Sequence, residues 1–208
     1  MPATASVTRS PDSDPERLWL SAHVSGDGAA FARVVSAYGP RILGYVRRSG
    51  VATADTEDVF QDIWATVHRG AHKYDSARPL APWLFTVAAN KVRSHLRRAT
   101  LATTGTDPET LTNGEAGGGP GAGGAYQLSA HQIAAGRELA TWIEGELHTL
   151  KDEARQIVLL CCVEQLTMSE TADALGIPEG TVKTGLHRAR LTLARSLARR
   201  RATQLEAV

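Results

Sequence analysis

Three carboxylates and a glutamine fall close together in the first third of the chain. Asp55, Asp58 and Asp62 follow i, i+3, i+7 spacing with Gln61 beside them, so a helix would bring the acids onto one side. Such a cluster could ligate a metal, act as an acid–base pair, stay a solvated surface, or dock onto a basic partner. Because no histidine lies within a turn and no nucleophile is nearby, we favour docking and expect no metal, cofactor or catalysis.

A second candidate set follows on a basic segment. The apolar spacing over residues 83–98 predicts a helix whose other side is polar and basic,. Asparagine can pair with adenine, and arginine with guanine or phosphate. The polar loop 73–79 precedes this helix and could hold an unstacked base. The candidate DNA-binding residues of this part are Lys73, Arg78, Asn90, Arg93 and Arg97.

The third pattern is a helix-turn-helix in the last quarter of the chain. Thr167 and Glu170 form a Thr-x-x-Glu capping box, which predicts a helix start,. Ala172 is small enough for two helices to approach closely, and Gly176 can take the left-handed conformation of a tight turn. Val182 then returns to the core, which completes the spacing of this motif.

The second helix of this motif presents an outward face suited to a DNA major groove. We take its DNA-reading candidates to be Thr181, Lys183, Thr184, His187 and Arg188. The competing interpretation is an amphipathic helical hairpin whose charged face is only solvated. The capping box and the turn residues favour the DNA-binding interpretation over the hairpin.

The elements that must position these residues are helical, and the predicted fold is all-α with two small domains. Residues 1–15 are rich in proline, serine and threonine and predict a disordered terminus,. Helical periodicity covers residues 16–98 and returns over residues 135–201. Between them, residues 99–134 contain many glycines and predict a flexible linker.

The composition suits a soluble protein with separated charges. Net charge is +1, from 23 Lys+Arg and 22 Asp+Glu, so any attraction to nucleic acid must come from local basic faces. No signal peptide or membrane-spanning segment is readable, which predicts a cytoplasmic protein without membrane insertion. Cys161 and Cys162 lie in an apolar run, where we expect them in the core; redox sensing and metal ligation are the alternatives.

Together these segments resemble the extracytoplasmic-function (ECF) sigma factors of the sigma-70 superfamily. Residues 55–62 look like region 2.2 of that family, residues 83–90 like regions 2.3 and 2.4, and residues 175–190 like region 4.2. The resemblance runs over about 16–98 and 135–198. Three motifs in family order are far more specific than any one of them.

The resemblance implies a non-enzymatic subunit that lends promoter recognition to RNA polymerase. Asp55, Asp58, Gln61 and Asp62 would dock on the clamp helices of the beta-prime subunit, with the beta flap as a further contact. The set from Lys73 to Arg97 would bind the minus-ten element, and the set from Thr181 to Arg188 the minus-thirty-five element. Family analogy also implies an anti-sigma factor, which no residue pattern here identifies.

Two departures and two alternatives accompany the resemblance. Gly185 stands where the family often has arginine, so we expect a missing phosphate contact and an altered minus-thirty-five preference. The glycine-rich linker should leave the angle between the domains unfixed. The first alternative is a helix-turn-helix regulator that binds operators without core polymerase, and the second is a helical adaptor without DNA affinity.

Overall fold

The structure is a computed structural model that describes residues 15–103 and 141–206. Within those ranges every regular element is a helix and no strand occurs, which confirms the predicted all-α fold. Two predicted segments lie outside the described residues. They are the predicted disordered terminus, up to residue 14, and the predicted linker with its surroundings, over residues 104–140. Residues 99–103, which the sequence assigned to the linker, continue the preceding helix instead.

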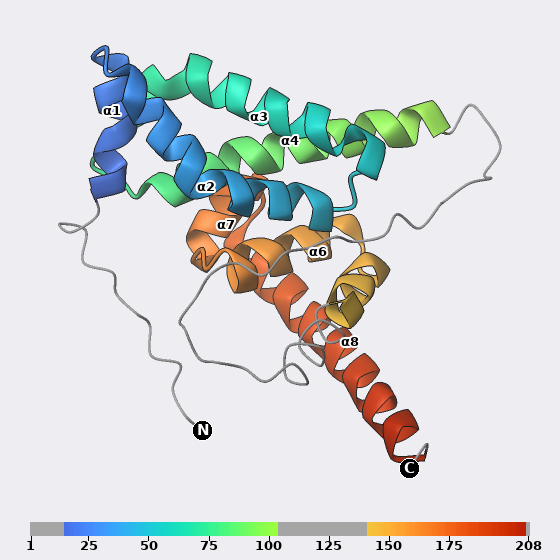
Figure 1. Cartoon of the computed structure of the whole chain (residues 1–208). Coiled ribbons are helices and arrows are strands. Elements are labelled where there is room, and N and C mark those ends of the chain that lie inside the picture. Colours follow the sequence, from blue (N-terminus) through green and yellow to red (C-terminus); the bar gives the residue numbers. More distant parts are fainter. Residues whose placement is uncertain (1–14, 104–140, 207–208) are drawn as a thin grey trace, which may run out of the picture.

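The first domain (residues 15–103) packs its helices around one apolar core (Figure 1). Its α-helices are α1 (Trp19–Val24), α2 (Gly28–Arg48), α3 (Thr56–Gly70) and α4 (Leu80–Thr103). Short 3-10 turns lie before α1 (Pro15–Leu18), between α2 and α3 (Thr53–Asp55) and directly after α3 (Ala71–Lys73). The apolar side of α3 is buried through Val59, Ile63 and Val67, so its acidic side is left to solvent.

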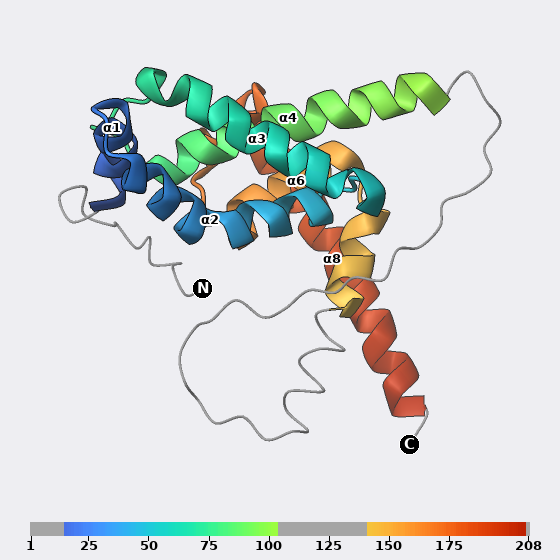
Figure 2. The ribbon, with the colours of Figure 1, turned by 45° about the horizontal axis from the view of Figure 1, so that its top comes forward.

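The second domain (residues 141–206) contains the helix-turn-helix. A helix over residues 141–149 leads to α6 (Asp152–Val158), a π-helical turn (Leu159–Val163), α7 (Met168–Leu175) and α8 (Glu179–Glu206). The N-terminal part of α8 packs on α6 and α7, and the rest of the helix runs away from the body of the protein (Figures 1 and 2). This arrangement leaves one face of the early turns of α8 open.

The local chemistry of the helix-turn-helix is as predicted from the sequence. The Thr167 hydroxyl accepts from the Glu170 backbone N–H at 3.1 Å, and the Glu170 carboxylate accepts from the Thr167 N–H at 2.8 Å. Gly176 ends α7 with φ of 60° in the left-handed region, where a side chain would be strained. The predicted capping box and turn are therefore confirmed.

Thr167→Ala should lower the free energy of unfolding by about 1 kcal/mol, because the Glu170 N–H in the first turn of α7 loses the Thr167 hydroxyl as its partner,. Urea denaturation followed by circular dichroism would measure the change. Ser169→Ala is the matched control, since Ser169 is exposed in the same turn and takes no part in the capping box. Equal effects of the two changes would contradict a capping role for Thr167.

The two domains pack against each other, which differs from the expectation of an unfixed angle. Helix α7 of the second domain lies on α4 of the first, and the buried apolar residues of both domains form one continuous cluster. Linker composition limits only how far apart two domains can be, and complementary surfaces can still hold them together. The contact includes Arg93, one of the predicted DNA-binding residues, together with Arg155 and Glu164, which carry no sequence signal of their own.

The cysteines are less buried than the apolar run suggested. Cys161 is half-buried and Cys162 is exposed, because the π-helical turn changes the direction of successive side chains relative to an α-helix,. Cys161 contacts the Thr171 hydroxyl at 3.2 Å, and burial raises the pKa of its thiol. The expectation that both thiols lie in the core was therefore wrong for Cys162.

Candidate functional surfaces

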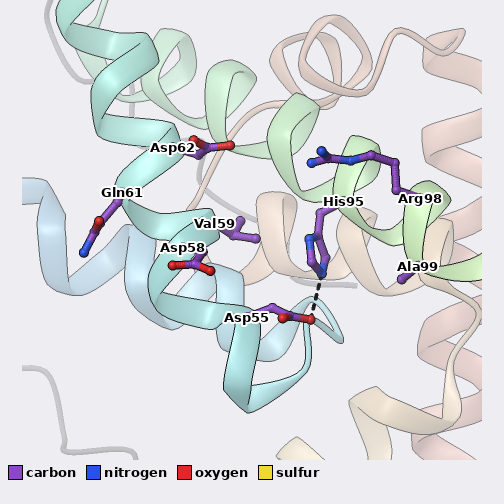
Figure 3. Close-up of a pocket in the computed structure, with 8 residues that line it drawn as sticks. All are labelled: Asp55, Asp58, Val59, Gln61, Asp62, His95, Arg98 and Ala99. Atoms are coloured by element: carbon purple, nitrogen blue, oxygen red, sulfur yellow. Dashed lines mark ion pairs between the residues drawn. The ribbon is translucent and has the colours of Figure 1, made fainter. Parts of the chain in front are cut away.

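The acidic face, which we define as Asp55, Asp58, Gln61 and Asp62, forms one wall of a groove between α3 and α4 (Figure 3). All but the half-buried Asp55 are exposed. The residues come from two successive turns of α3 and from the turn just before it. The prediction that the three carboxylates lie on one side of a helix is confirmed in its geometry, with Gln61 beside them.

The opposite wall of the groove carries basic residues that sequence reasoning missed. His95 approaches the Asp55 carboxylate at 3.3 Å, and Lys91 approaches Asp62 at 3.8 Å. Arg98 lines the same groove. Lys91, His95 and Arg98 follow i, i+4, i+7 spacing on α4, which is the signal that could have found them.

The acidic face keeps free hydrogen-bonding capacity even with these neighbours. At 3.8 Å Lys91 makes only a loose pair with Asp62, whose side chain stays 61% exposed. The Gln61 amide donates to the Glu57 carboxylate at 3.0 Å and, in Figure 3, points away from α4. Three or more potential metal ligands do not gather anywhere in the described residues. Exposed carboxylates of this kind are suited to contact with a basic protein surface.

The predicted minus-ten residues divide into two groups. Asn90 and Arg93 are joined on α4, where the Arg93 guanidinium donates to the Asn90 side-chain oxygen at 3.1 Å. Arg97 follows one turn later and is exposed. Lys73 and Arg78 are exposed in the segment before α4. In this structure Arg93 also donates to the backbone carbonyl of Leu175, at the end of α7, so it is engaged by the second domain.

The loop before α4 is fixed in place by local hydrogen bonds. Asp75 accepts from the Ala77 N–H at 2.9 Å and lies 3.8 Å from the Arg78 guanidinium. The Tyr74 hydroxyl donates to the Arg78 carbonyl at 2.6 Å, and its ring packs 5.4 Å from that of Trp83. The loop is thereby held against the start of α4.

The predicted minus-thirty-five residues occupy the open face of α8. All five are exposed, whereas the apolar residues between them are buried against α6 and α7. These five are Thr181, Lys183, Thr184, His187 and Arg188. The Thr184 hydroxyl is turned toward its own helix and donates to the Gly180 carbonyl at 2.8 Å. The other side chains are available to reach outward from the helix.

Gly185 lies where α8 packs on α6. A Cβ atom at this residue would lie 2.7 Å from the Cδ1 atom of Ile157 in α6. A side chain here would therefore begin against α6 rather than in solvent. The tip of the Ile157 side chain would have to shift to admit a side chain at residue 185.

A polar seam holds the two domains together. Arg155 of α6 is 6% exposed, and its guanidinium donates to the carbonyls of Leu147, His148 and Leu150 in its own domain and of Ser49 in the first domain, at 2.9–3.1 Å. Two ion pairs flank it. Arg41 lies 3.0 Å from Glu164, and Arg48 lies 3.3 Å from Glu144.

Glu164 should make stability depend on pH. Burial raises the pKa of its carboxyl above the ordinary 4.5, although Arg41 acts in the opposite direction. The folded protein therefore binds the Glu164 proton more tightly than the unfolded chain does. The stabilisation of the folded state that results is fully present below pH 4.5 and is lost as pH rises through the raised pKa. We expect Glu164→Gln to remove this step from the pH dependence of the free energy of unfolding, measured by urea denaturation.

The same substitution should leave stability at pH 7 unchanged or slightly increased, because a neutral amide is less costly to bury than a carboxylate. A loss of several kcal/mol at pH 7, or an unchanged step in the pH profile, would contradict this role for Glu164.

Comparison with known families defines the class of protein. The family "Sigma-70 region 2" matches residues 34–101, and the family "Sigma-70, region 4" matches residues 141–193. The two matches fall on the two domains in that order. The chain is therefore a two-domain protein of the sigma-70 type.

Individual relatives narrow this class. The chain is 31% identical to the ECF RNA polymerase sigma factor RpoE of Cereibacter sphaeroides, over 81% of this chain and 85% of the relative. It is 30% identical to ECF sigma factor SigM of Mycobacterium tuberculosis, over 94% of this chain and 90% of the relative. The chain belongs to the extracytoplasmic-function sigma factors of the sigma-70 family.

Solved structures share the fold. CnrH in complex with the cytosolic domain of CnrY has a TM-score of 0.62 at 24% identity and covers 89% of this chain and 98% of that one. RpoE in complex with the anti-sigma factor NepR from Bartonella quintana has a TM-score of 0.60 at 20% identity, with 81% and 96% covered. Across residues 15–103 and 141–206, none of the helices combines the length and apolar character that crossing a membrane requires.

Proposed function

We propose that this sigma factor docks on core RNA polymerase through its acidic face and reads the promoter through two basic faces. The observation that carries the proposal is the separation of the faces. Asp58, Gln61 and Asp62 are exposed on α3 in the first domain, and the five minus-thirty-five candidates are exposed on α8 in the second. The protein itself makes and breaks no bond, and the polymerase supplies the catalysis.

The clamp helices of beta-prime are the proposed partner of the acidic face. Highly exposed carboxylates contribute mainly to the orientation and specificity of a protein–protein contact of this kind. The apolar surface of the second domain near Val163 and Met168, which are 45% and 39% exposed, is a suitable site for the beta flap. Contacts on both domains would fix their separation on the polymerase.

The minus-ten element is the proposed ligand of Asn90, Arg93 and Arg97 on α4. An adenine can pair with the Asn90 amide, while the two guanidinium groups bind phosphate or guanine. Lys73 and Arg78 flank the rigid loop before α4, where they could hold a base flipped out of the duplex. Capturing such a base would offset part of the unstacking cost, which is a few kcal/mol.

Arg188→Ala should change which minus-thirty-five sequences are bound, because a bidentate contact to guanine contributes roughly 1–3 kcal/mol of discrimination. Arg195→Ala is the matched control. Arg195 is exposed two turns further along α8, and its loss should weaken binding uniformly while reducing the salt dependence. Holoenzyme binding to a library of minus-thirty-five variants would measure both, and the same effect from both changes would argue against base reading by Arg188.

Control by an anti-sigma factor is proposed by analogy. CnrH and RpoE of Bartonella quintana were both solved in complexes, the first with CnrY and the second with the anti-sigma factor NepR. An inhibitor of this chain would act by covering the acidic face or by clamping the two domains.

Run-off transcription with core polymerase on a promoter library tests the function as a whole. A sigma factor should produce transcripts from a defined subset of promoters only when core is present. Operator binding by the protein alone, unaffected by core, would favour the helix-turn-helix regulator instead. Absence of DNA binding with or without polymerase would favour an adaptor.

A further inference from the structure

The outer side of α8 carries one line of exposed polar and basic residues that runs well past the recognition turns. Thr181, Thr184 and Arg188 belong to the proposed minus-thirty-five surface. Arg195 and Arg199 follow Arg188 at i+7 and i+11 and are exposed as well. Because α8 runs straight over this length (Figure 1), this spacing keeps the two arginines on the side of Arg188. The face proposed to read DNA therefore continues for about three more turns.

This continuation lies beyond the helix-turn-helix that the family shares. The match to region 4 ends at residue 193, whereas α8 continues to Glu206. Between residues 180 and 205 the sequence has seven lysines and arginines and no acidic residue. In a protein whose net charge is only +1, such a stretch is a local concentration of positive charge that suits a polyanion.

The inner side of α8 is packed, which fixes the direction of the outer side. Leu193 packs against the apolar core, and Leu197 is half-buried. The guanidinium carbon of Arg200 lies 5.3 Å from the ring centroid of Trp142, so the helix over residues 141–149 supports the distal half of α8. A ligand-binding surface held in place in this way loses little conformational freedom on binding. The line of arginines is therefore preorganised.

We propose that the distal half of α8 is a second DNA contact, in which Arg195 and Arg199 bind backbone phosphates directly upstream of the minus-thirty-five element. The inference rests on the proposed reading of that element by α8. At 1.5 Å per residue the two arginines lie about 10 and 17 Å beyond Arg188, too far to share the base edges of a groove about 12 Å wide. They meet the phosphates that border the groove, as the C-terminal end of the recognition helix does in homeodomains.

The upstream side follows from the arrangement of the two domains. The first domain carries the proposed minus-ten surface, and the distal half of α8 extends away from that domain (Figures 1 and 2). Of the two DNA segments that flank the minus-thirty-five element, the one remote from the minus-ten element therefore lies nearer the arginines. A phosphate contact carries no sequence information, so the upstream segment adds affinity without adding specificity.

Removing the two charges should weaken promoter binding and make it less dependent on salt. Arg195→Gln with Arg199→Gln keeps the helix, because glutamine is a good helix former. In equilibrium titrations of labelled promoter DNA with holoenzyme, the plot of log association constant against log salt concentration should be shallower by about 2, one for each lost phosphate contact. The advantage of the wild type should accordingly shrink about tenfold between 50 and 200 mM salt.

The length of the promoter DNA locates the contact. One duplex extends a full helical turn upstream of the minus-thirty-five element, and a second duplex ends at the element itself. On the long duplex the wild type should bind more tightly than the double glutamine variant, whereas on the short one the two should bind equally, because the phosphates are gone. Arg195→Lys with Arg199→Lys keeps the charge that a phosphate requires and should behave like the wild type on both.

Arg69→Gln with Lys151→Gln is the matched control, because it removes one exposed positive charge from each domain and leaves α8 intact. Its affinity relative to the wild type should be the same on both duplexes. Equal weakening of the double glutamine variant on the two duplexes, an unchanged salt slope, or an altered minus-thirty-five preference would each overturn the upstream contact. A wild-type holoenzyme that shows no preference for promoter on either duplex would instead overturn the proposed function.

Discussion

Replacing Asp58 and Asp62 by lysine should reduce binding to core RNA polymerase by roughly a hundredfold, because like charges would then face each other across the interface at a cost of several kcal/mol. Both carboxylates are exposed on α3, and the one ion pair that Asp62 makes with Lys91 is loose, at 3.8 Å. The fold should therefore survive, since exposed pairs of this kind contribute about 0–1 kcal/mol. Co-purification with core and a direct titration would measure the loss.

Two comparisons sharpen this experiment. Asp58→Asn with Asp62→Asn removes the charge without reversing it and should give an intermediate loss. Glu179→Lys reverses the charge of one exposed carboxylate in the second domain and should leave core binding intact. If the double lysine variant keeps its helicity and still binds core like the wild type, α3 is not the docking element.

Arg155→Met should lower the free energy of unfolding by about 3–5 kcal/mol, the range expected when one partner is removed from a buried charged network. The guanidinium satisfies four backbone carbonyls, and methionine offers no donor to any of them. For a chain of this size, the melting temperature should fall by roughly 10 °C. Thermal unfolding followed by circular dichroism would show it.

Two further substitutions identify the cause of that loss. Arg195→Met removes an exposed arginine from α8 and should change stability by no more than about 0.5 kcal/mol. Arg155→Lys keeps the charge but lacks the planar fork of donors, so it should recover only part of the stability. Complete recovery by lysine would mean that charge, and not the set of carbonyl hydrogen bonds, is what matters.

Local sequence signals predicted the elements that carry the candidate surfaces. The i, i+3, i+7 spacing of the acids needs only one helix to bring them together, and α3 does so. The capping box at Thr167 and the glycine at residue 176 act through backbone groups a few residues away, so their chemistry can be read without a tertiary structure. The helix-turn-helix was predictable for that reason.

Contacts between distant residues were not predictable in the same way. Nothing near Arg155 in the sequence indicates that its partner is the carbonyl of Ser49, 106 residues earlier. Arg93 looked like a DNA-binding residue because its helical face is basic, and the packing of α7 on α4 gives it a second partner. The exposure of Cys162 depends on a π-helical turn, which hydrophobic periodicity does not distinguish from an α-helix.

Gly50 lies in the connection after α2 with φ of 92°, and a Cβ atom on it would overlap a guanidinium nitrogen of Arg155. A side chain at residue 50 would therefore require the Arg155 guanidinium to leave its present position in this packing. The two positions should show evolutionary covariation: homologues that pack their domains in this way keep both residues, and those that lose the glycine lose the arginine as well. Aligned sequences of such homologues would then indicate which sigma factors pack their domains in this way without a structure of each one.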